Sequence, residues 1–112
     1  MLSSRGSGDL SGWPDFADYI VEAGFGDVYG RDGLTLAQRQ LLNVAILTSI
    51  GGAERQLAVQ IRGALHVGVC PREIVEAIFH VGLYAGHPRA VNAFRIAKET
   101  LEEQGVTVEG SR

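Results

Sequence analysis

Apolar residues recur at three- and four-residue intervals along most of the chain, a spacing that places them on one face of an α-helix. Helix-starting and helix-breaking residues divide this pattern into five segments. We expect helices from Pro14 to Gly24, from the Thr35 cap to about Ser49, from Ala53 to about His66, from Pro71 to Tyr84, and from Pro88 to just before Gly105. No segment sustains the alternation of apolar and polar residues that is typical of a strand. The pattern therefore predicts an all-α bundle of five to six helices.

Residue types with special backbone preferences support these boundaries. Proline suits the first turn of a helix, where its missing N–H has no partner to lose. Gly68 is well placed to form a left-handed cap after the third helix. The second helix is apolar nearly all round, which is typical of a central buried helix. Three glycines interrupt the stretch FGDVYGRDGL, so we expect a loop there with a helical turn around Asp27 to Tyr29.

Length and charge limit the classes of function. The 112 residues suffice for one domain, which we place at 14–105 between a Ser- and Gly-rich tail (1–13) and a short C-terminal tail (106–112). The formal net charge of -3 and the pI near 5.5 argue against nucleic acid or an anionic membrane as partner. No apolar run approaches the roughly 20 residues that cross a bilayer, and the N-terminus lacks the apolar core of a signal peptide. We therefore expect a cytoplasmic protein.

The fourth helix carries the main cluster of reactive side chains. Glu76, His80 and Tyr84 follow one another at four-residue steps and so line one stripe of the helix. A carboxylate one turn from an imidazole can fix its tautomer, and a phenol one turn further can donate to a developing oxyanion. The alternative is a solvated stripe at the boundary of the core without any catalytic role. Spacing alone favours that alternative.

Other reactive groups stand singly. Arg39 and Arg62 interrupt largely apolar helices and could each bind a substrate carboxylate or form an ion pair between subunits. His66 and His87 lie at helix ends, and the sequence has no His-x-x-x-His or Glu-x-x-His pair, so we expect no metal site. The single cysteine, Cys70, has no second cysteine with which to form a disulfide.

The order of residues is informative beyond these single groups. The stretches FGDVYGRDGLTLAQRQLLNVAILTSIG and RQLAVQIRGALHVGVCPREIVEAIFHVGLYAGHPRAVNAFRIAKETL resemble the carboxymuconolactone decarboxylase family. The likeness covers about Phe16 to Leu101. Its most specific parts are the aromatic-glycine loop before the capped helix, the IRGAL-x-x-G stretch and the YAG-x-P-x-A-x-N-A-F stretch. The sequence is identified as a member of this family.

The resemblance implies an AhpD-like helical fold that assembles as a homotrimer or homohexamer, with pockets near subunit contacts. It also implies decarboxylation of γ-carboxymuconolactone to β-ketoadipate enol-lactone without a cofactor, as in aromatic catabolism. A sister branch, similar to the alkylhydroperoxidase AhpD, uses a Cys-x-x-Cys pair followed by His. Here the matching positions hold Ala53, Gln56 and Gln60, and the helix glutamate of that branch falls on Gln40. We therefore predict no peroxidase activity.

Gln60 also departs from the decarboxylase branch, which normally carries a histidine at this position. A glutamine can hydrogen-bond but cannot exchange a proton near neutral pH. His80 matches a histidine seen in many relatives, and we predict that it is the acid. We expect Tyr84 or Gln60 to bind the enolate oxygen. Arg39, which matches a family arginine, would bind a substrate carboxylate, with Glu76 beside the substrate.

Three functions remain open from the sequence. The first is a cofactor-independent lyase that acts on a small lactone or enolisable carboxylic acid. The same groups would serve an isomerase or cyclase of a polyketide-like metabolite. The third is a non-catalytic protein for small-molecule binding or assembly, in which the replacement of the family histidine by Gln60 removed the chemistry.

Overall fold

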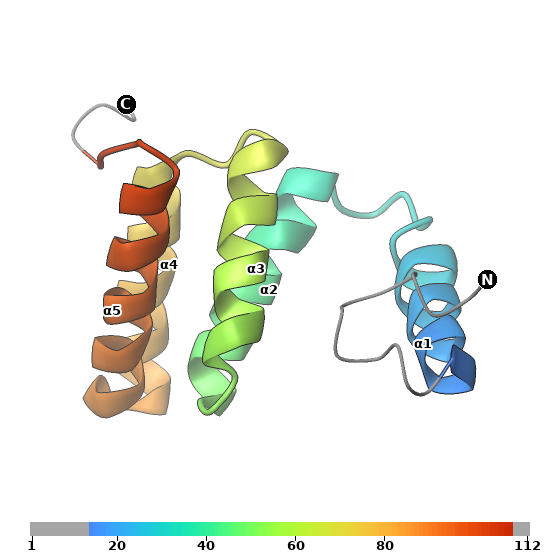
Figure 1. Ribbon diagram of the computed structural model, residues 1–112, viewed down its shortest axis with the longest axis horizontal. Coiled ribbons are helices and arrows are strands. Elements are labelled where there is room, and N and C mark those ends of the chain that lie inside the picture. Colours follow the sequence, from blue (N-terminus) through green and yellow to red (C-terminus); the bar gives the residue numbers. More distant parts are fainter. Residues whose placement is uncertain (1–13, 109–112) are drawn as a thin grey trace. The chain divides into compact units, whose positions relative to one another are not determined.

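The computed structural model describes residues 14–108, and these residues form helices and no strands, as predicted (Figure 1). The elements are α1 (Pro14–Val21), the π-helix η3 (Glu22–Val28), α2 (Leu36–Ile50), α3 (Glu54–His66), α4 (Pro71–Ala85) and α5 (His87–Glu103). The predicted N-terminal tail, 1–13, lies outside the described residues. The chain divides into two compact units, Met1–Thr35 and Leu36–Arg112.

The first unit contains α1 and η3, and here the predicted helix end was wrong. We expected Gly24 to stop the helix, but α1 gives way at Glu22 to the wider π-helical turns of η3, which continue to Val28. Glycine weakens a helix by only about 1 kcal/mol relative to alanine, so Gly24 does not forbid a helical backbone. On α1, the rings of Phe16 and Tyr19 stack with centroids 6.5 Å apart.

The second unit is a four-helix arrangement built around one apolar core. In Figure 1, α5 lies in front of α4 and α3 in front of α2, and each of these pairs is in contact. The largest fully buried side chains of the core are Val44, Thr48, Ile61, Ile74 and Ile78. On α3 the residues predicted to share one face behave as expected, because Leu57, Ile61 and Ala64 are buried. Ala97 and Leu101 of α5 belong to the same cluster, so the hydrophobic effect holds all four helices on one core.

The environment of α2 differs from the prediction of a helix buried all round. Its buried residues are Gln40, Val44 and Thr48, which lie at four-residue steps and face the core. Leu42, Ile46 and Ile50 are exposed in this single copy. The reason is geometric, since α3, α4 and α5 all pack on the core side of α2 and leave its other face uncovered.

The helix ends of this unit lie close to their predicted positions. Gly68 has φ +98°, as expected of a left-handed residue after α3, and the N–H of Val69 donates to the carbonyl of Ala64 at 2.9 Å. Within the predicted C-terminal tail, Val106 and Val108 pack against the core. The beginning of this segment is therefore part of the packed unit.

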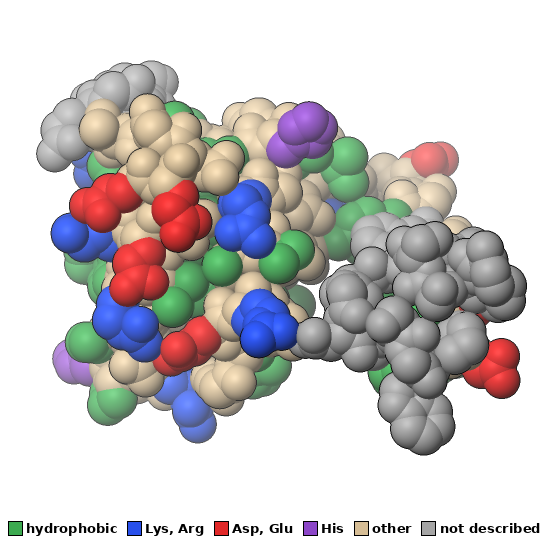
Figure 2. Space-filling model, in the orientation of Figure 1, with side chains coloured by type: hydrophobic (Ala, Val, Ile, Leu, Met, Phe, Trp, Pro, Cys, Tyr) green, Lys and Arg blue, Asp and Glu red, His purple; other side chains and the backbone are tan. Residues whose placement is uncertain are grey.

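Charged side chains of both signs are intermixed over α5 in Figure 2. Arg95 Nη2 lies 2.9 Å from Glu54 Oε2 on α3, and Lys98 Nζ lies 3.2 Å from Glu102 Oε2. Exposed pairs of this kind contribute at most about 1 kcal/mol each, so the apolar core dominates stability. Within residues 14–108, every helix is too short or too polar to cross a membrane.

The core can be tested at α4. We expect Ile78→Ala to lower the free energy of unfolding by about 2–5 kcal/mol, because it leaves a cavity at a fully buried position. Urea denaturation followed by circular dichroism measures this loss. The exposed Val59→Ala change is the control, with an expected effect below about 0.5 kcal/mol. Equal losses at the two positions would contradict the placement of the core.

Candidate functional site

Three carboxamide side chains meet between α2 and α3. Gln40 Nε2 donates to Gln60 Oε1 at 3.0 Å, and Asn43 Nδ2 donates to the same oxygen at 3.0 Å. Asn43 Nδ2 also donates to Gln40 Oε1 at 3.2 Å. Gln40 is only 9% exposed, so its amide would cost about 1–3 kcal/mol if it were left without hydrogen bonds. These bonds therefore fix the three side chains, hereafter the carboxamide cluster, relative to one another.

Gly63 makes room for this cluster. It lies one turn after Gln60 on α3, and a Cβ atom at this position would lie 2.8 Å from Gln40 Nε2. That separation is well inside van der Waals contact. Any larger residue would push the Gln40 amide away from its present position. The glycine of the IRGAL stretch is therefore explained by the close approach of the Gln40 side chain and not by a turn of the backbone.

A groove of about 300 Å³ opens beside the cluster. It is lined by Asn43, Ile46, Leu47, Gln56 and Gln60, so two elements, α2 and α3, supply its walls. Its volume lies at the lower end of the range that binds small molecules. None of the five lining side chains can carry a charge or exchange a proton near neutral pH. The groove can donate and accept hydrogen bonds and can cover an apolar group, but it holds no acid or base of its own.

The predicted stripe on α4 lies elsewhere. The rings of His80 and Tyr84 are 5.9 Å apart at an angle of 51°, so the structure brings these two together. Both are exposed, Tyr84 to 83%. The carboxylate of Glu76 faces Arg72, with 4.0 Å between Oε2 and Nη1, and makes no hydrogen bond to His80 in the part of the chain described. His80 and Tyr84 are thus neighbours, whereas Gln60 belongs to a different surface.

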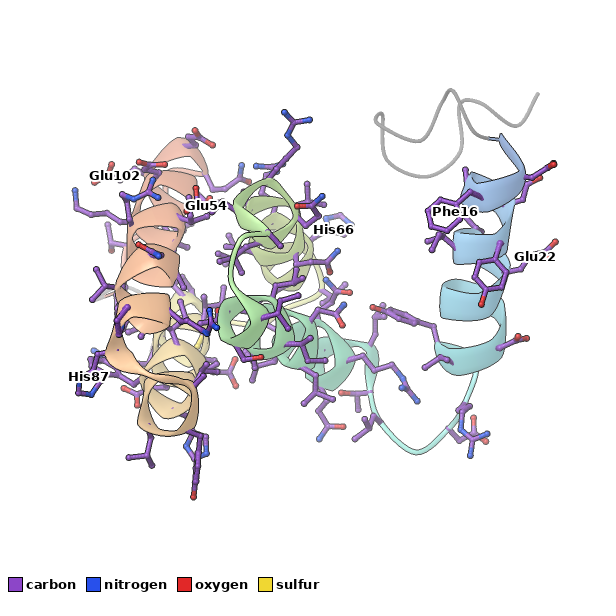
Figure 3. The ribbon with its side chains drawn as sticks, turned by 90° about the horizontal axis from the view of Figure 1, so that it is seen from below. Phe16, Glu22, Glu54, His66, His87 and Glu102 are labelled. Atoms are coloured by element: carbon purple, nitrogen blue, oxygen red, sulfur yellow. The ribbon has the colours of Figure 1, made fainter. Side chains whose placement is uncertain are left out.

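The remaining candidates are dispersed. Arg39 is half-buried on α2 next to Gln40, but it is not one of the residues that line the groove. His66 and His87 point away from each other at the end of α3 and the start of α5 (Figure 3). Among the described residues, no three His, Cys, Asp or Glu side chains lie close enough to hold a metal ion.

Cys70 directly precedes α4 and has a structural role there. Its backbone N–H donates to Glu73 Oε1 at 2.9 Å, which satisfies one of the unpaired donors at the start of the helix. The thiol is half-buried.

The sequence analysis did not assign a site role to Asn43, Gln40 or Gln56. The signal was available in the spacing. Gln40 and Asn43 are three residues apart on one helix, and Gln56 and Gln60 are four apart on the next, so each pair shares a helix face. Polar residues at such intervals inside apolar helices indicate a common polar surface. The pairing of the two faces required the fold.

Comparison with known proteins adds the family context. The model of the carboxymuconolactone decarboxylase family matches residues 14–99. The chain is 34% identical over 95 residues to a 4-carboxymuconolactone decarboxylase of Acinetobacter baylyi. The aligned residues are 85% of this chain and 70% of the relative. It is 34% identical over 87 residues to the nitrosuccinic acid decarboxylase of Metarhizium robertsii, covering 77% of this chain and 59% of the relative. An uncharacterised 15.0 kDa protein of Paracoccus denitrificans is 36% identical over 86 residues, 76% of this chain and 64% of the relative.

Proposed function

The chain belongs to the carboxymuconolactone decarboxylase family, and on this basis we propose that it is a cofactor-independent decarboxylase of a small carboxylic acid. The observation that carries the proposal is the groove on α2 and α3, in which Gln60 is held by the carboxamide cluster. Decarboxylation without a cofactor needs a donor for the charge that develops on the substrate, and an amide N–H is such a donor.

The two decarboxylases among the relatives suggest the class of substrate. In nitrosuccinic acid the carboxyl group is bonded to a carbon that carries a nitro group, and in carboxymuconolactone the lactone carbonyl can accept electrons. When the carbon–carboxyl bond breaks, carbon dioxide leaves and the electron pair moves onto a nitro or carbonyl oxygen. A proton is then added to carbon. The proposed substrate is therefore a carboxylic acid whose carboxyl-bearing carbon is bonded to, or conjugated with, an electron-accepting nitro or carbonyl group.

We assign the roles as follows. Gln60 donates a hydrogen bond to the oxygen that gains charge, and His80 supplies the proton to carbon. Arg39 binds a second carboxylate of the substrate, and Glu76 and Tyr84 line the approach to His80. Since no residue of the groove can exchange a proton near neutral pH, the acid has to come from outside its walls. We assign that role to His80 of a neighbouring copy.

Self-association is part of this proposal. The stripe on α4 that carries His80 also presents Leu83, 71% exposed, and Phe79, and the outer face of α2 presents Ile46 and Ile50. Large apolar side chains that are exposed on successive turns of a helix can form an apolar patch, and apolar patches commonly mark a protein interface. A homotrimer or homohexamer would cover both faces and bring His80 to the groove of another copy.

Analytical ultracentrifugation tests the assembly. We expect a homotrimer or homohexamer of the 12.0 kDa chain at micromolar concentration. Leu83→Glu should shift the protein toward the monomer, because it places a charge on the covered face. Gln104→Glu, exposed at the end of α5, adds the same charge and should leave the assembly intact. A wild-type protein that sediments only as a monomer would contradict the proposal.

Release of carbon dioxide tests the function itself. We expect the purified protein to decarboxylate 4-carboxymuconolactone or nitrosuccinic acid faster than buffer does, in the presence of a metal chelator. Ion chromatography or a coupled carbon dioxide assay measures the rate. Gln60→Glu keeps an acceptor at this position but removes the N–H donor, so it should lose most of the activity. Gln104→Glu, exposed at the end of α5, is the matched control and should retain it.

A non-catalytic binding protein is the second candidate. It is favoured by one observation, which is that the groove lacks an acid or base. Such a protein would bind small acids in the groove and release no carbon dioxide from them. Both candidate functions use the groove as the binding site. They differ in whether His80 transfers a proton.

A further inference from the structure

We propose that Gln40 and Asn43 are positioning residues that orient the Gln60 amide with its Nε2 group toward the groove. The groove would then recognise a single anionic oxygen through an uncharged donor. This inference rests on the proposed function only in taking the groove as the binding site. It adds which residues orient the Gln60 N–H donor and which type of ligand group that donor recognises.

The hydrogen bonds of the cluster carry the argument. Gln60 Oε1 accepts two of them, from Gln40 Nε2 and Asn43 Nδ2, each at 3.0 Å. A carbonyl oxygen has two lone pairs, so both are used. Gln60 makes no other hydrogen bond to the described residues, which leaves both hydrogens of its Nε2 available. Gln60 and Asn43 line the groove, whereas Gln40, which also donates to the Gln60 oxygen, does not. With that oxygen occupied by the cluster, Nε2 is the atom of the Gln60 amide that remains for a ligand in the groove.

Gln40 is held in turn by its surroundings. It is nearly buried, it accepts a hydrogen bond from Asn43 Nδ2 at 3.2 Å, and it occupies the space that a side chain at Gly63 would fill. A reversed network, in which all three amides are turned over, would make Gln60 a donor to the cluster and leave its oxygen facing the groove. The two arrangements predict opposite chemistry for the groove, because one presents a donor and the other an acceptor.

The presented donor defines the ligand. An N–H group binds a carboxylate, enolate or nitronate oxygen more strongly than a neutral carbonyl. The groove adds Ile46 and Leu47 as an apolar wall and no cationic side chain. It therefore suits one delocalised anionic oxygen attached to a small apolar skeleton. A second carboxylate would have to bind outside the groove.

Side-chain amide exchange in the free protein tests the orientation. With ¹⁵N-labelled protein, we expect the Nε2 hydrogens of Gln60 to exchange with water quickly and those of Gln40 to exchange slowly. Gln40→Glu removes the donor that holds the Gln60 oxygen and leaves an acceptor, so the Gln60 amide should turn and its hydrogens should become protected. Gln104→Glu is the control and should change neither rate. Protected Gln60 hydrogens in the wild type would overturn the proposal, because they indicate the reversed network.

Titration with succinate, and with neutral succinamide as a comparison, tests recognition. We expect a saturable shift of the Gln60 Nε2 signals with succinate, and an affinity that falls about tenfold or more in Gln40→Glu, as for the loss of one hydrogen bond to a charged group. Asn43→Asp is the second variant and should act in the same direction. An unchanged affinity in folded variants, or no shift at Gln60, would overturn the proposal. Neither the amide exchange nor the titration needs catalytic activity. A failure of this inference can therefore be distinguished from a failure of the decarboxylase proposal.

Discussion

Replacing His80 with glutamine is expected to lower kcat/KM for decarboxylation by at least about a hundredfold, the usual lower effect of losing a general acid. Protonation of carbon near neutral pH requires a group that titrates there, and histidine is the side chain that does so. His80 lies within α4 on an exposed stripe beside Tyr84. Glutamine preserves the bulk and hydrogen-bonding capacity, so the fold and the assembly should survive. Steady-state rates with the identified substrate measure the effect.

His66→Gln and His87→Gln are the controls, since both residues lie at helix ends. Each should lower kcat/KM much less than His80→Gln does. Mixing variants tests whether His80 acts across subunits. Random mixing of His80→Gln and Gln60→Glu chains would recover about a quarter of the sites if each site takes one residue from each of two copies. If both residues came from the same copy, mixing would recover none. Full activity of folded, assembled His80→Gln protein would remove His80 from the mechanism.

Gly63→Ala is expected to lower kcat/KM by about tenfold to a hundredfold, while the free energy of unfolding falls by at most about 2.5 kcal/mol. Alanine within a helix is more stable than glycine by roughly 0.5–1 kcal/mol. The added methyl group would meet Gln40 Nε2 at 2.8 Å and displace it. Functional groups need their positions held within about 0.5 Å, so the orientation of Gln60 should be lost. A large loss of activity with only a small loss of stability distinguishes this effect from simple damage to the core.

A double-mutant cycle provides the control for Gly63. If the methyl group acts through Gln40, then Gly63→Ala should cost little further activity in a chain that already carries Gln40→Ala. Additive losses from the two changes would indicate that Gly63 affects the groove by another route. Thermal denaturation of the same four proteins shows whether the fold is retained.

Much of the fold could be predicted because local signals agree with the tertiary structure. Apolar periodicity identified α3, and Leu57 and Ile61 are buried as expected. Pro71 and Gly68 placed the start of α4 and the end of α3 to within about a residue. The prediction was wrong at Gly24, where the chain continues as a π-helix, because one glycine costs only about 1 kcal/mol and does not by itself end a helix. It was also wrong for the outer face of α2, since apolar residues do not reveal whether the same chain covers them.

The candidate site was less predictable because it depends on pairing between helices. The spacing of Glu76, His80 and Tyr84 was visible in the sequence, yet Glu76 faces Arg72 rather than His80. Gln60 was singled out from the family resemblance, whereas its partners Gln40 and Asn43 could be recognised only when α2 and α3 were placed side by side. A hydrogen-bonded cluster across two helices has no signature within either one.

Decarboxylation in D₂O, followed by NMR, tests the central claim most directly. With 4-carboxymuconolactone or nitrosuccinic acid as substrate, we predict carbon dioxide release well above the buffer rate. We also predict one deuterium per turnover, present in one configuration, because an enzyme group protonates a bound carbanion. With nitrosuccinic acid the deuterium is bonded to the carbon that lost the carboxyl group. With 4-carboxymuconolactone it is bonded to the ring carbon next to the lactone carbonyl, because the carbon that lost the carboxyl group becomes part of the double bond of the enol-lactone. Equal amounts of both configurations would mean that water protonates a released carbanion, and so would contradict the role of His80. Release at the buffer rate by folded protein, with either substrate bound in the groove, would contradict the decarboxylase proposal and leave the chain a binding protein.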